Sequence, residues 1–350
     1  MLGMKMTLAK IMIALRCGRR FLPGWVPGGL LLPLAAFAPV FAASAGNVAL
    51  AAPATPPSPP LRQSLDDAWW TGPMLANSAA TLPRGHFLIE PYIYDVSSRH
   101  ADGFGSQAYI LYGLTDRLTA GLIPVLGYNR MQGAANSTGV GLGDASVQAQ
   151  YRLTRFHAGS SLPTISLQLQ ETLPTGGYDR LGNRLSDGLG SGATTTTLQL
   201  NTQTYFWLAN GRILRMRFNV AQSWSRRAHL ADVSVYGTVA GFRGNAKPGN
   251  AFFVDAAWEY SLSLRWVLAL DVTYRRSHAT HVDGSALADS AGAPAIAIHR
   301  SFGAGEAFGF APAIEYSWNA NLGILVGTRV IGGPHTTTTI TPAVAINYVH

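Results

Sequence analysis

Charged side chains recur at alternate positions within apolar stretches of the chain. Arg215 and Arg217 flank one apolar residue, and Asp255 and Glu259 share a parity further along. Charges of both signs on one face either pair and hold an interior together, or line a watery path and select ions. Both interpretations remain open. The candidate lumen and selectivity residues are Asp144, Arg152, Arg215, Arg217, Asp255, Glu259, Asp271, Arg275, Glu315 and Arg329.

Other residues with reactive side chains form weaker patterns. His278 and His281 are three apart, but a metal site needs three or four converging ligands. The glycines of GVGLGD (139–144) lead into a strand pattern, whereas a phosphate loop leads into a helix. A serine hydrolase needs a histidine within reach of its nucleophile, and the sequence shows no obvious pair. We therefore predict no catalytic residue, no metal and no cofactor.

The elements that carry these charges alternate with a period of two. In LGDASVQAQYRLT (142–154), one parity holds Asp144, Gln148 and Arg152, and the other holds Val147 and Tyr151. This period indicates a β-strand with one polar and one apolar face. The same period predicts twelve strands, at 86–97, 104–114, 117–128, 142–154, 162–172, 194–208, 213–225, 251–262, 265–276, 306–317, 322–331 and 336–349.

The connections between the predicted strands alternate between short and long. Long ones cover 98–103, 129–141, 173–193, 226–250 and 277–305, whereas the turn at 332–335 is tight. In an up-and-down barrel, alternate connections emerge at opposite ends, and outer-membrane barrels have short periplasmic turns and longer outside loops. The sequence thus predicts an all-β, transmembrane, antiparallel up-and-down barrel of about twelve strands in the bacterial outer membrane.

Aromatic residues on the apolar parity collect near both ends of the predicted strands. Tyr112, Trp266 and Trp318 lie near short turns, and Trp224 and Phe308 lie near long loops. Amphipathic rings favour the two membrane interfaces. We therefore expect the apolar parity to face lipid and the polar parity to face a watery lumen.

The N-terminal region differs in composition from the barrel. Residues 1–45 combine a basic start, an apolar run and small residues, as in an export signal. Cys17, the only cysteine, lies within this leader. Five of the 26 basic residues lie in the first 20 positions, which leaves 21 basic against 18 acidic residues and argues against nucleic acid as a partner. The predicted division is a signal peptide (1–45), a Pro-rich linker and N-terminal segment (46–85) and a barrel (86–350).

The end of the N-terminal segment carries the motif DDAWW. One hypothesis makes it a plug, in which Asp66 and Asp67 meet lumenal arginines while Trp69 and Trp70 contact a hydrophobic solute. The alternative is a periplasmic tail packed on the barrel rim. The sequence favours neither.

Several motifs resemble one known family. They are DDAWWTGPMLANSAATLPRGHFLIEPYIYD, GLGDASVQAQYRL, LPTGGYDRLG and the pair GNAFFVDAAWEYSL and LRWVLALDVTYRR. Over about residues 65–350, the chain resembles the Gram-negative outer-membrane transporter family named for the MetA pathway of phenol degradation. The resemblance implies an outer-membrane barrel linked to the passage of aromatic or hydrophobic compounds. It implies no ligand-binding residue.

Three functions are compatible with these observations. The first is a channel or transporter that passes small solutes passively, aromatic or hydrophobic ones included. The alternatives are a closed structural or interaction barrel with surface-exposed binding loops, and a barrel-borne hydrolase. The expected partners are outer-membrane lipids, an unidentified small solute and the barrel-assembly machinery, which recognises C-terminal strands like TPAVAINYVH; this strand ends in His350 where many end in Phe.

Overall fold

The computed structural model describes residues 61–99, 101–286 and 294–350. The predicted leader and the first part of the linker, residues 1–60, lie outside the described residues. No helix in the described ranges is long and apolar enough to cross a membrane.

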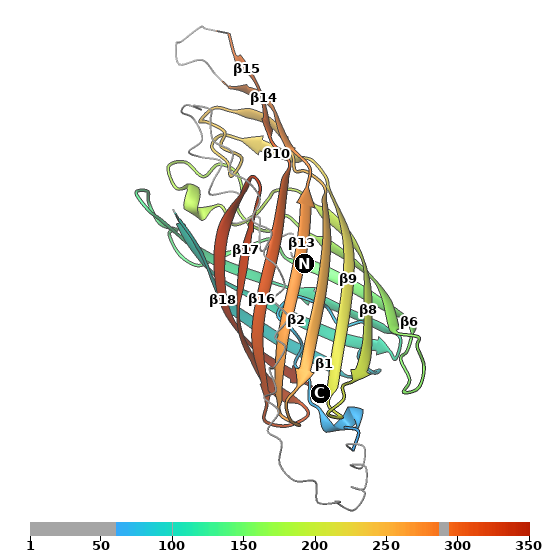
Figure 1. Cartoon of the computed structure of the whole chain (residues 1–350). Helices are drawn as coiled ribbons and strands as arrows, with labels where there is room; N and C mark the ends of the chain where they lie inside the picture. The colour runs from blue at the N-terminus through green and yellow to red at the C-terminus, as the bar shows by residue number, and fades with distance from the viewer. Residues whose placement is uncertain (1–60, 100, 287–293) are drawn as a thin grey trace, which may run out of the picture.

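The described chain forms a closed antiparallel barrel of twelve spans (Figure 1). Strand β1 pairs with both β18 and β2, which closes the sheet. Two spans each consist of two strands in line, β3 with β4 and β5 with β6. The barrel strands are β1 (Phe87–Ser98), β2 (Ala101–Thr115), β3 (Leu118–Ile123), β4 (Val125–Met131), β5 (Gly141–Leu142), β6 (Ser146–Thr154), β7 (Thr164–Thr172), β8 (Thr195–Trp207), β9 (Ile213–Ser225), β12 (Ala251–Ser261), β13 (Trp266–Ser277), β16 (Gly305–Ser317), β17 (Leu322–Gly333) and β18 (Thr336–Val349). The predicted fold class is confirmed.

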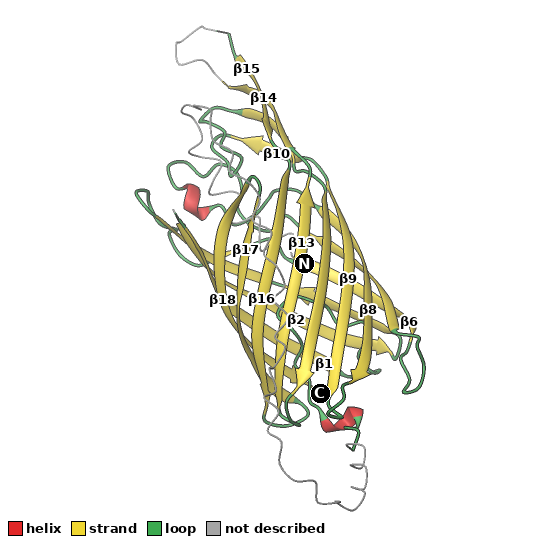
Figure 2. Ribbon diagram, viewed as in Figure 1, coloured by secondary structure: helices red, strands yellow, loops and turns green. Residues whose placement is uncertain are grey.

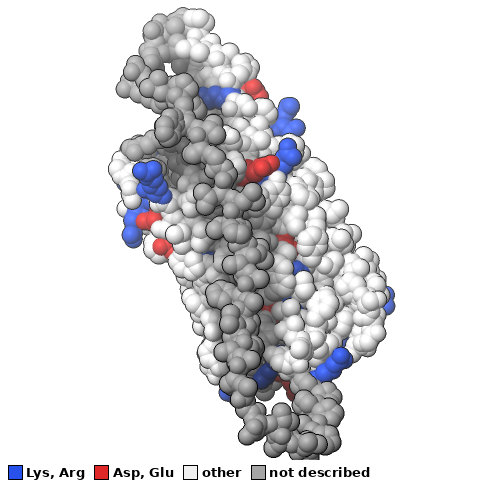
Figure 3. All heavy atoms as spheres, in the orientation of Figure 1, with Lys and Arg blue, Asp and Glu red and all other residues white. Residues whose placement is uncertain are grey.

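Each span buries one parity of its side chains and exposes the other. In β6, Ser146, Gln148 and Gln150 are buried, whereas Val147 and Tyr151 are exposed. The outward aromatic residues include Tyr112, Trp266 and Trp318 toward the short turns, and Phe104, Trp224 and Phe308 toward the long loops. In the space-filling view the visible wall is mainly uncharged (Figure 3). The outer face therefore has the apolar band and aromatic ends of a membrane-embedded barrel.

Two neighbouring spans are interrupted at the same level. Pro124 separates β3 from β4, because proline has no N–H to donate to the sheet. Opposite it, residues 143–145 separate β5 from β6, and only the Gly143 N–H reaches the Val125 carbonyl, at 2.8 Å. The ladder of backbone hydrogen bonds is therefore interrupted at this level, and backbone groups of the wall can bond to partners on the lumen side.

The long connections contain structure that the sequence pattern did not predict. A second sheet, in the order β10-β11-β14-β15, projects from the long-loop end of the barrel (Figure 1). Its strands are β10 (Ala228–Ala231), β11 (Arg243–Lys247), β14 (Thr280–Ala286) and β15 (Ile296–Phe302). We predicted only long connections at 226–250 and 277–305, so these four strands were missed. The connection expected at 98–103 is also shorter, since β2 begins at Ala101.

Two short 3-10 helices lie at opposite ends of the barrel (Figure 2). Helix η1 (Leu65–Asp67) lies by the short turns, and η2 (Leu185–Asp187) lies among the long loops. The segment between η1 and β1 continues into the barrel, where it contacts the inner walls.

Candidate functional site: the lumen

A charge-paired cluster occupies the short-turn half of the lumen. Glu259 on β12 accepts hydrogen bonds from Arg215 on β9, through Nε at 2.6 Å and through Nη2. Nε of Arg217 lies 3.0 Å from the same carboxylate. All three side chains are buried. Cross-strand register explains the contact, because Glu259 is directly opposite Arg215 and diagonal to Arg217.

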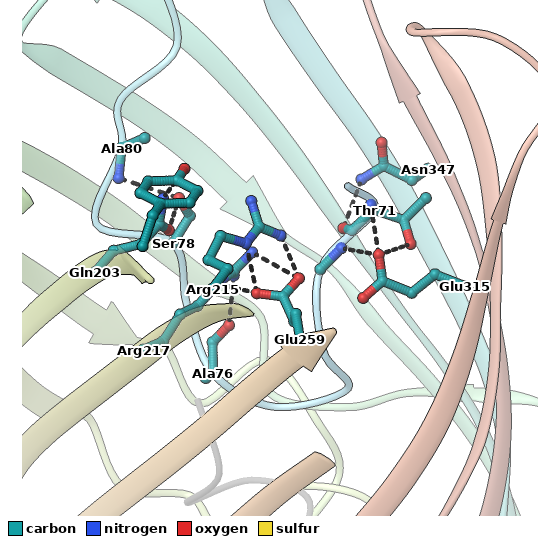
Figure 4. A network of polar contacts seen from close by, with 12 residues as sticks. Thr71, Ala76, Ser78, Ala80, Gln203, Arg215, Arg217, Glu259, Glu315 and Asn347 are labelled. Carbon is teal, nitrogen blue, oxygen red and sulfur yellow. Dashed lines mark hydrogen bonds and ion pairs between the residues drawn. The ribbon is translucent and has the colours of Figure 1, made fainter. Parts of the chain in front are cut away.

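The residues 69–84, which we call the lumen segment, pass between the walls of the barrel. The segment enters beside the short turns, where the Trp69 N–H donates to the Leu264 carbonyl at 2.9 Å. It leaves at the same end, where the Arg84 N–H donates to the carboxylate of Asp116 at 3.0 Å. Between these points residues 72–76 are buried. The segment therefore folds into the lumen and returns (Figure 4).

Wall carboxylates and a guanidinium hold the backbone of this segment. Glu315 accepts the N–H of Thr71 at 2.7 Å and the N–H of Gly72 at 3.0 Å. Asp271 accepts the N–H of Ala76 at 3.0 Å, and Arg217 donates to the carbonyl of the same residue at 2.9 Å. Irregular backbone at membrane depth needs such partners, because no sheet or helix satisfies it.

Neutral amides continue this wall beyond the charged cluster. Asn77 donates to Gln168 at 3.1 Å, and Ser78 donates to Gln203 at 3.1 Å. Gln150 donates to the carbonyls of Ser78 and Ala80, at 2.9 and 3.2 Å. The lumen over β6 to β13 is therefore polar, and most of its wall side chains are hydrogen-bonded.

The opposite wall of the lumen carries an apolar and aromatic cluster. A buried cluster joins Met74 and Leu75 of the lumen segment to inward residues of the surrounding strands. The rings of Tyr92 and Tyr109 meet edge to face, with centroids 5.9 Å apart. The strand residues of this cluster are Tyr92, Tyr94, Val96, Tyr109, Ile123, Ala311, Leu325, Ala343 and Ala345. The lumen thus has a polar side and, across from it, a side where this aromatic cluster lies beside polar groups such as Gln107 and Thr341.

The connection 173–194, which we call the mouth loop, folds against the inner wall at the long-loop end. Asp144 accepts hydrogen bonds from the Gly176 N–H at 3.1 Å and from both the N–H and the hydroxyl of Ser191 at 2.7 Å. Thr175 accepts the Ala145 N–H at 2.9 Å and donates to the Gly143 carbonyl at 2.7 Å. The mouth loop therefore fills the break between β5 and β6.

Further contacts fix the mouth loop from both sides. Asn129 donates to the Ser186 carbonyl at 2.8 Å, and Leu189 packs over Gly127 and Gly141, which have no side chain in its way. From the outer sheet region, the Tyr236 hydroxyl donates to the Ser191 carbonyl at 2.5 Å. Burial raises the pKa of Tyr236, so its hydroxyl remains a proton donor.

The structure places eight of the ten predicted charged residues in two groups. Arg215, Arg217, Glu259 and Glu315 lie together in the short-turn half (Figure 4). Asp271 lies beside this group, where it accepts the Ala76 N–H. Asp255, Arg275 and Arg329 lie in the long-loop half, where their strands run toward the outer sheet.

Asp144 and Arg152, the two remaining members of the predicted set, lie away from the charge-paired cluster. Asp144 holds the mouth loop, and Arg152 lies near the short turns among Arg117, Arg155 and Asp116. Parity placed both side chains on the inner face, but it did not give their depth.

The four predicted residues of the DDAWW motif divide into two pairs. Asp66 and Asp67 are exposed and lie at the capping box of η1, whereas the plug hypothesis had them meet lumenal arginines. Trp70 lies against Arg215, whose guanidinium carbon is 4.4 Å from the ring centroid. Trp69 lies at the rim below Arg265, at 5.9 Å.

Sequence reasoning missed the tyrosine side of the lumen. Tyr92 and Tyr94 share a parity with Glu90, and this polar neighbour was the signal for an inward face. It also missed the partners of the mouth loop, which no periodic pattern marks. Within the described ranges, no group of three or more His, Cys, Asp or Glu side chains is arranged to hold a metal ion.

Comparison with solved structures shows likeness to outer-membrane barrels. The COG4313 outer membrane channel from Pseudomonas putida F1 matches with a TM-score of 0.57 and 14% identity, over 79% of this chain and 100% of that one. The β domain of the Bordetella autotransporter BrkA gives 0.41 and 12%, over 76% and 99%. The NanC porin gives 0.40 and 11%, over 74% and 98%. No curated protein matches the sequence.

A family model identifies the chain itself. The model described as "Putative MetA-pathway of phenol degradation" matches residues 72–331, which include the lumen segment from Gly72 and most of the barrel. This confirms the resemblance carried by the DDAWW, GLGD and LPTGG motifs. The chain belongs to this family, and it is a β-barrel of the bacterial outer membrane.

Proposed function

We propose that the protein is a passive outer-membrane channel for small solutes, including aromatic and hydrophobic ones. The observation that carries this proposal is the two-sided lumen, in which a hydrogen-bonding wall faces a wall of tyrosines and aliphatic side chains. A polar wall keeps a path hydrated, and an aromatic wall favours rings and other apolar surfaces.

The comparisons support the same class of function. The family description refers to phenol degradation, and the Pseudomonas putida structure of similar fold is titled an outer membrane channel. Twelve strands lie between the eight that fill their interior with side chains and the sixteen or more that leave a wide aqueous pore. A narrow path is the natural outcome.

Two built-in segments narrow this path. Solute entering from outside passes the mouth loop, and it then meets the lumen segment in the short-turn half. The segment has no regular secondary structure between η1 and β1, and side-chain hydrogen bonds hold it. Each such bond contributes only about 0.5–1.5 kcal/mol, so local shifts of the segment are accessible. The proposed passage involves no bond chemistry, and the proposal is therefore for a channel and not an enzyme.

Planar-bilayer recording of the refolded mature chain, residues 46–350, tests the proposal. We expect steady, small openings, and we expect added phenol to lower the current by occupying the aromatic side. Folding is checked independently by heat-modifiable gel migration. A correctly folded protein that carries no current would contradict the open path and favour the closed interaction barrel.

A further inference from the structure

The long-loop half of the lumen contains three charged groups that the charge-paired cluster does not include. Arg275 on β13 and Arg329 on β17 flank β16, and Asp255 lies on β12. On the buried parity of β16, the residues between them are small, namely Ala307, Gly309 and Ala311. No long side chain of β16 therefore stands between the two arginines.

Several buried polar atoms of these three groups have no hydrogen-bond partner among the described residues, although Asp255 interacts electrostatically with Arg217 and Asp271. Arg329 is 1% exposed, and its Nε and Nη1 atoms are enclosed without a hydrogen bond. The enclosed Nε of Arg275 and both carboxylate oxygens of Asp255 are also unpartnered. An enclosed charge without a partner is costly, and most such groups in proteins are paired.

The contrast with the short-turn half of the lumen indicates what the arginines lack. There, Glu259 forms ion pairs with both Arg215 and Arg217, and Glu315 also acts on the two arginines. Arg275 and Arg329 instead lie close enough to repel each other. An anion between the two guanidiniums would remove this repulsion, and a carboxylate matches their planar donors.

Aromatic side chains adjoin the two arginines. Phe253 on β12 is directly opposite Arg275 in the sheet register, and it packs against the lumenal cluster that contains Tyr94. Tyr94 interacts electrostatically with Arg329. Asp255 is two residues from Phe253 on the same face, so a hydrogen-bond acceptor lies beside the aromatic surface.

We propose that Arg275, Arg329, Phe253, Tyr94 and Asp255 form a binding site for a small hydroxylated aromatic carboxylate. The arginines take the carboxylate, the two rings contact the aromatic ring, and Asp255 accepts a hydrogen bond from the ring hydroxyl. This site rests on the proposed channel function and names the class of solute that the channel selects.

Titration calorimetry on the detergent-solubilised mature chain tests the site with three probes: 4-hydroxybenzoate, benzoate and phenol. We expect affinity to fall in that order, because benzoate lacks the hydroxyl and phenol lacks the carboxylate. Arg329→Gln and Arg275→Gln should each weaken binding of 4-hydroxybenzoate by about tenfold or more. Asp255→Asn should reduce the preference for 4-hydroxybenzoate over benzoate.

Arg276→Gln is the matched control, because Arg276 is next to Arg275 but exposed on the other face, 3.8 Å from Glu306. It should bind 4-hydroxybenzoate like the unaltered chain. Arg329→Lys keeps the charge without the planar fork. We expect this variant to fold normally and to bind 4-hydroxybenzoate more weakly than the unaltered chain. Phenol binding as tightly as 4-hydroxybenzoate, or equal losses in Arg276→Gln and Arg329→Gln, would overturn the site.

The bilayer recording separates this site from the proposed function. A protein that conducts but binds none of the probes overturns the site and leaves the channel in place. A protein that binds 4-hydroxybenzoate through Arg329 but never conducts overturns the passive channel and supports the site.

Discussion

At the scale of single residues, one carboxylate forms ion pairs with two guanidiniums. Glu259 is fully buried, and its loss would leave Arg215 and Arg217 without the partner that offsets their desolvation. Breaking a buried ion pair on one side costs about 3–5 kcal/mol. We expect Glu259→Gln to lower the free energy of unfolding by about this amount, measured by reversible urea unfolding in lipid vesicles.

The exposed pair of Arg276 and Glu306 provides the control for this measurement. Its atoms are 3.8 Å apart, and both side chains are largely solvent-accessible. Pairs of this kind contribute about 0–1 kcal/mol. Glu306→Gln should therefore change little. Equal losses of unfolding free energy in the two variants would show that Glu259 does not offset the desolvation of Arg215 and Arg217.

Residue-level prediction from sequence succeeded for the face of each charge and failed for its depth. The two-residue period puts both Arg152 and Arg217 on the inner parity, and both side chains lie on the inner face of the barrel. Their contacts differ because the stagger between neighbouring strands sets depth, and stagger depends on the register of the whole closed sheet. Arg217 therefore meets the lumen segment, whereas Arg152 lies by the short turns.

At the scale of elements, the lumen segment is joined to the wall by side-chain hydrogen bonds that a covalent link could replace. Asn77 donates to Gln168 at 3.1 Å through the ends of both side chains, and residues 46–350 contain no cysteine. A direct disulfide needs β-carbons about 4 Å apart, so a short, reductant-cleavable bis-thiol linker is the better match for this pair. We expect the double variant Asn77→Cys and Gln168→Cys, once linked, to carry less current than after reductant cleaves the linker, because the segment is then held in the lumen. Each single-cysteine variant should respond less to reductant. A current unchanged by linking, with the link verified by mass, would mean that passage needs no movement of the segment.

The mouth loop is the second element whose position depends on few groups. Asp144 accepts three hydrogen bonds from it, and Asn cannot accept equally well at both side-chain atoms because one is an NH₂ donor. We expect Asp144→Asn to free the loop and to speed trypsin cleavage after Arg184, which is exposed within it. Asp283→Asn, on the exposed outer sheet, should leave cleavage at Arg184 unchanged. Slow cleavage in both variants would mean that contacts other than those of Asp144 hold the mouth loop in place.

These two elements also show why sequence reasoning reached only part of the interior. A barrel strand repeats every two residues, so all twelve spans were predictable. The lumen segment and mouth loop have no period, because their backbone is satisfied by side chains from distant strands, such as Asp271 and Asp144. Tryptophans and aspartates near the N-terminus suggested a plug, but they did not show which of them enter the lumen.

At the scale of the whole molecule, the barrel presents an apolar band to its surroundings because each strand exposes its hydrophobic parity. Leu200 lies in the middle of β8 and is 41% exposed, whereas Leu264 lies in a short turn and is 39% exposed. Exposure, which is nearly the same for Leu200 and Leu264, therefore does not distinguish the two positions. They differ in their expected depth in a bilayer.

This difference gives a test of membrane placement that is independent of transport. Arginine on the lipid face costs about 2–4 kcal/mol at the bilayer midplane and about 0–1 kcal/mol near the interface. We expect Leu200→Arg to lower the free energy of unfolding from phospholipid vesicles by the larger amount and Leu264→Arg by the smaller, both measured by urea-dependent folding. In a detergent micelle, which deforms around a charge more readily, the gap between the variants should narrow. Equal costs in vesicles would mean that Leu200 does not lie at the centre of the membrane. The membrane midplane would then have to cross the barrel at another level along its axis.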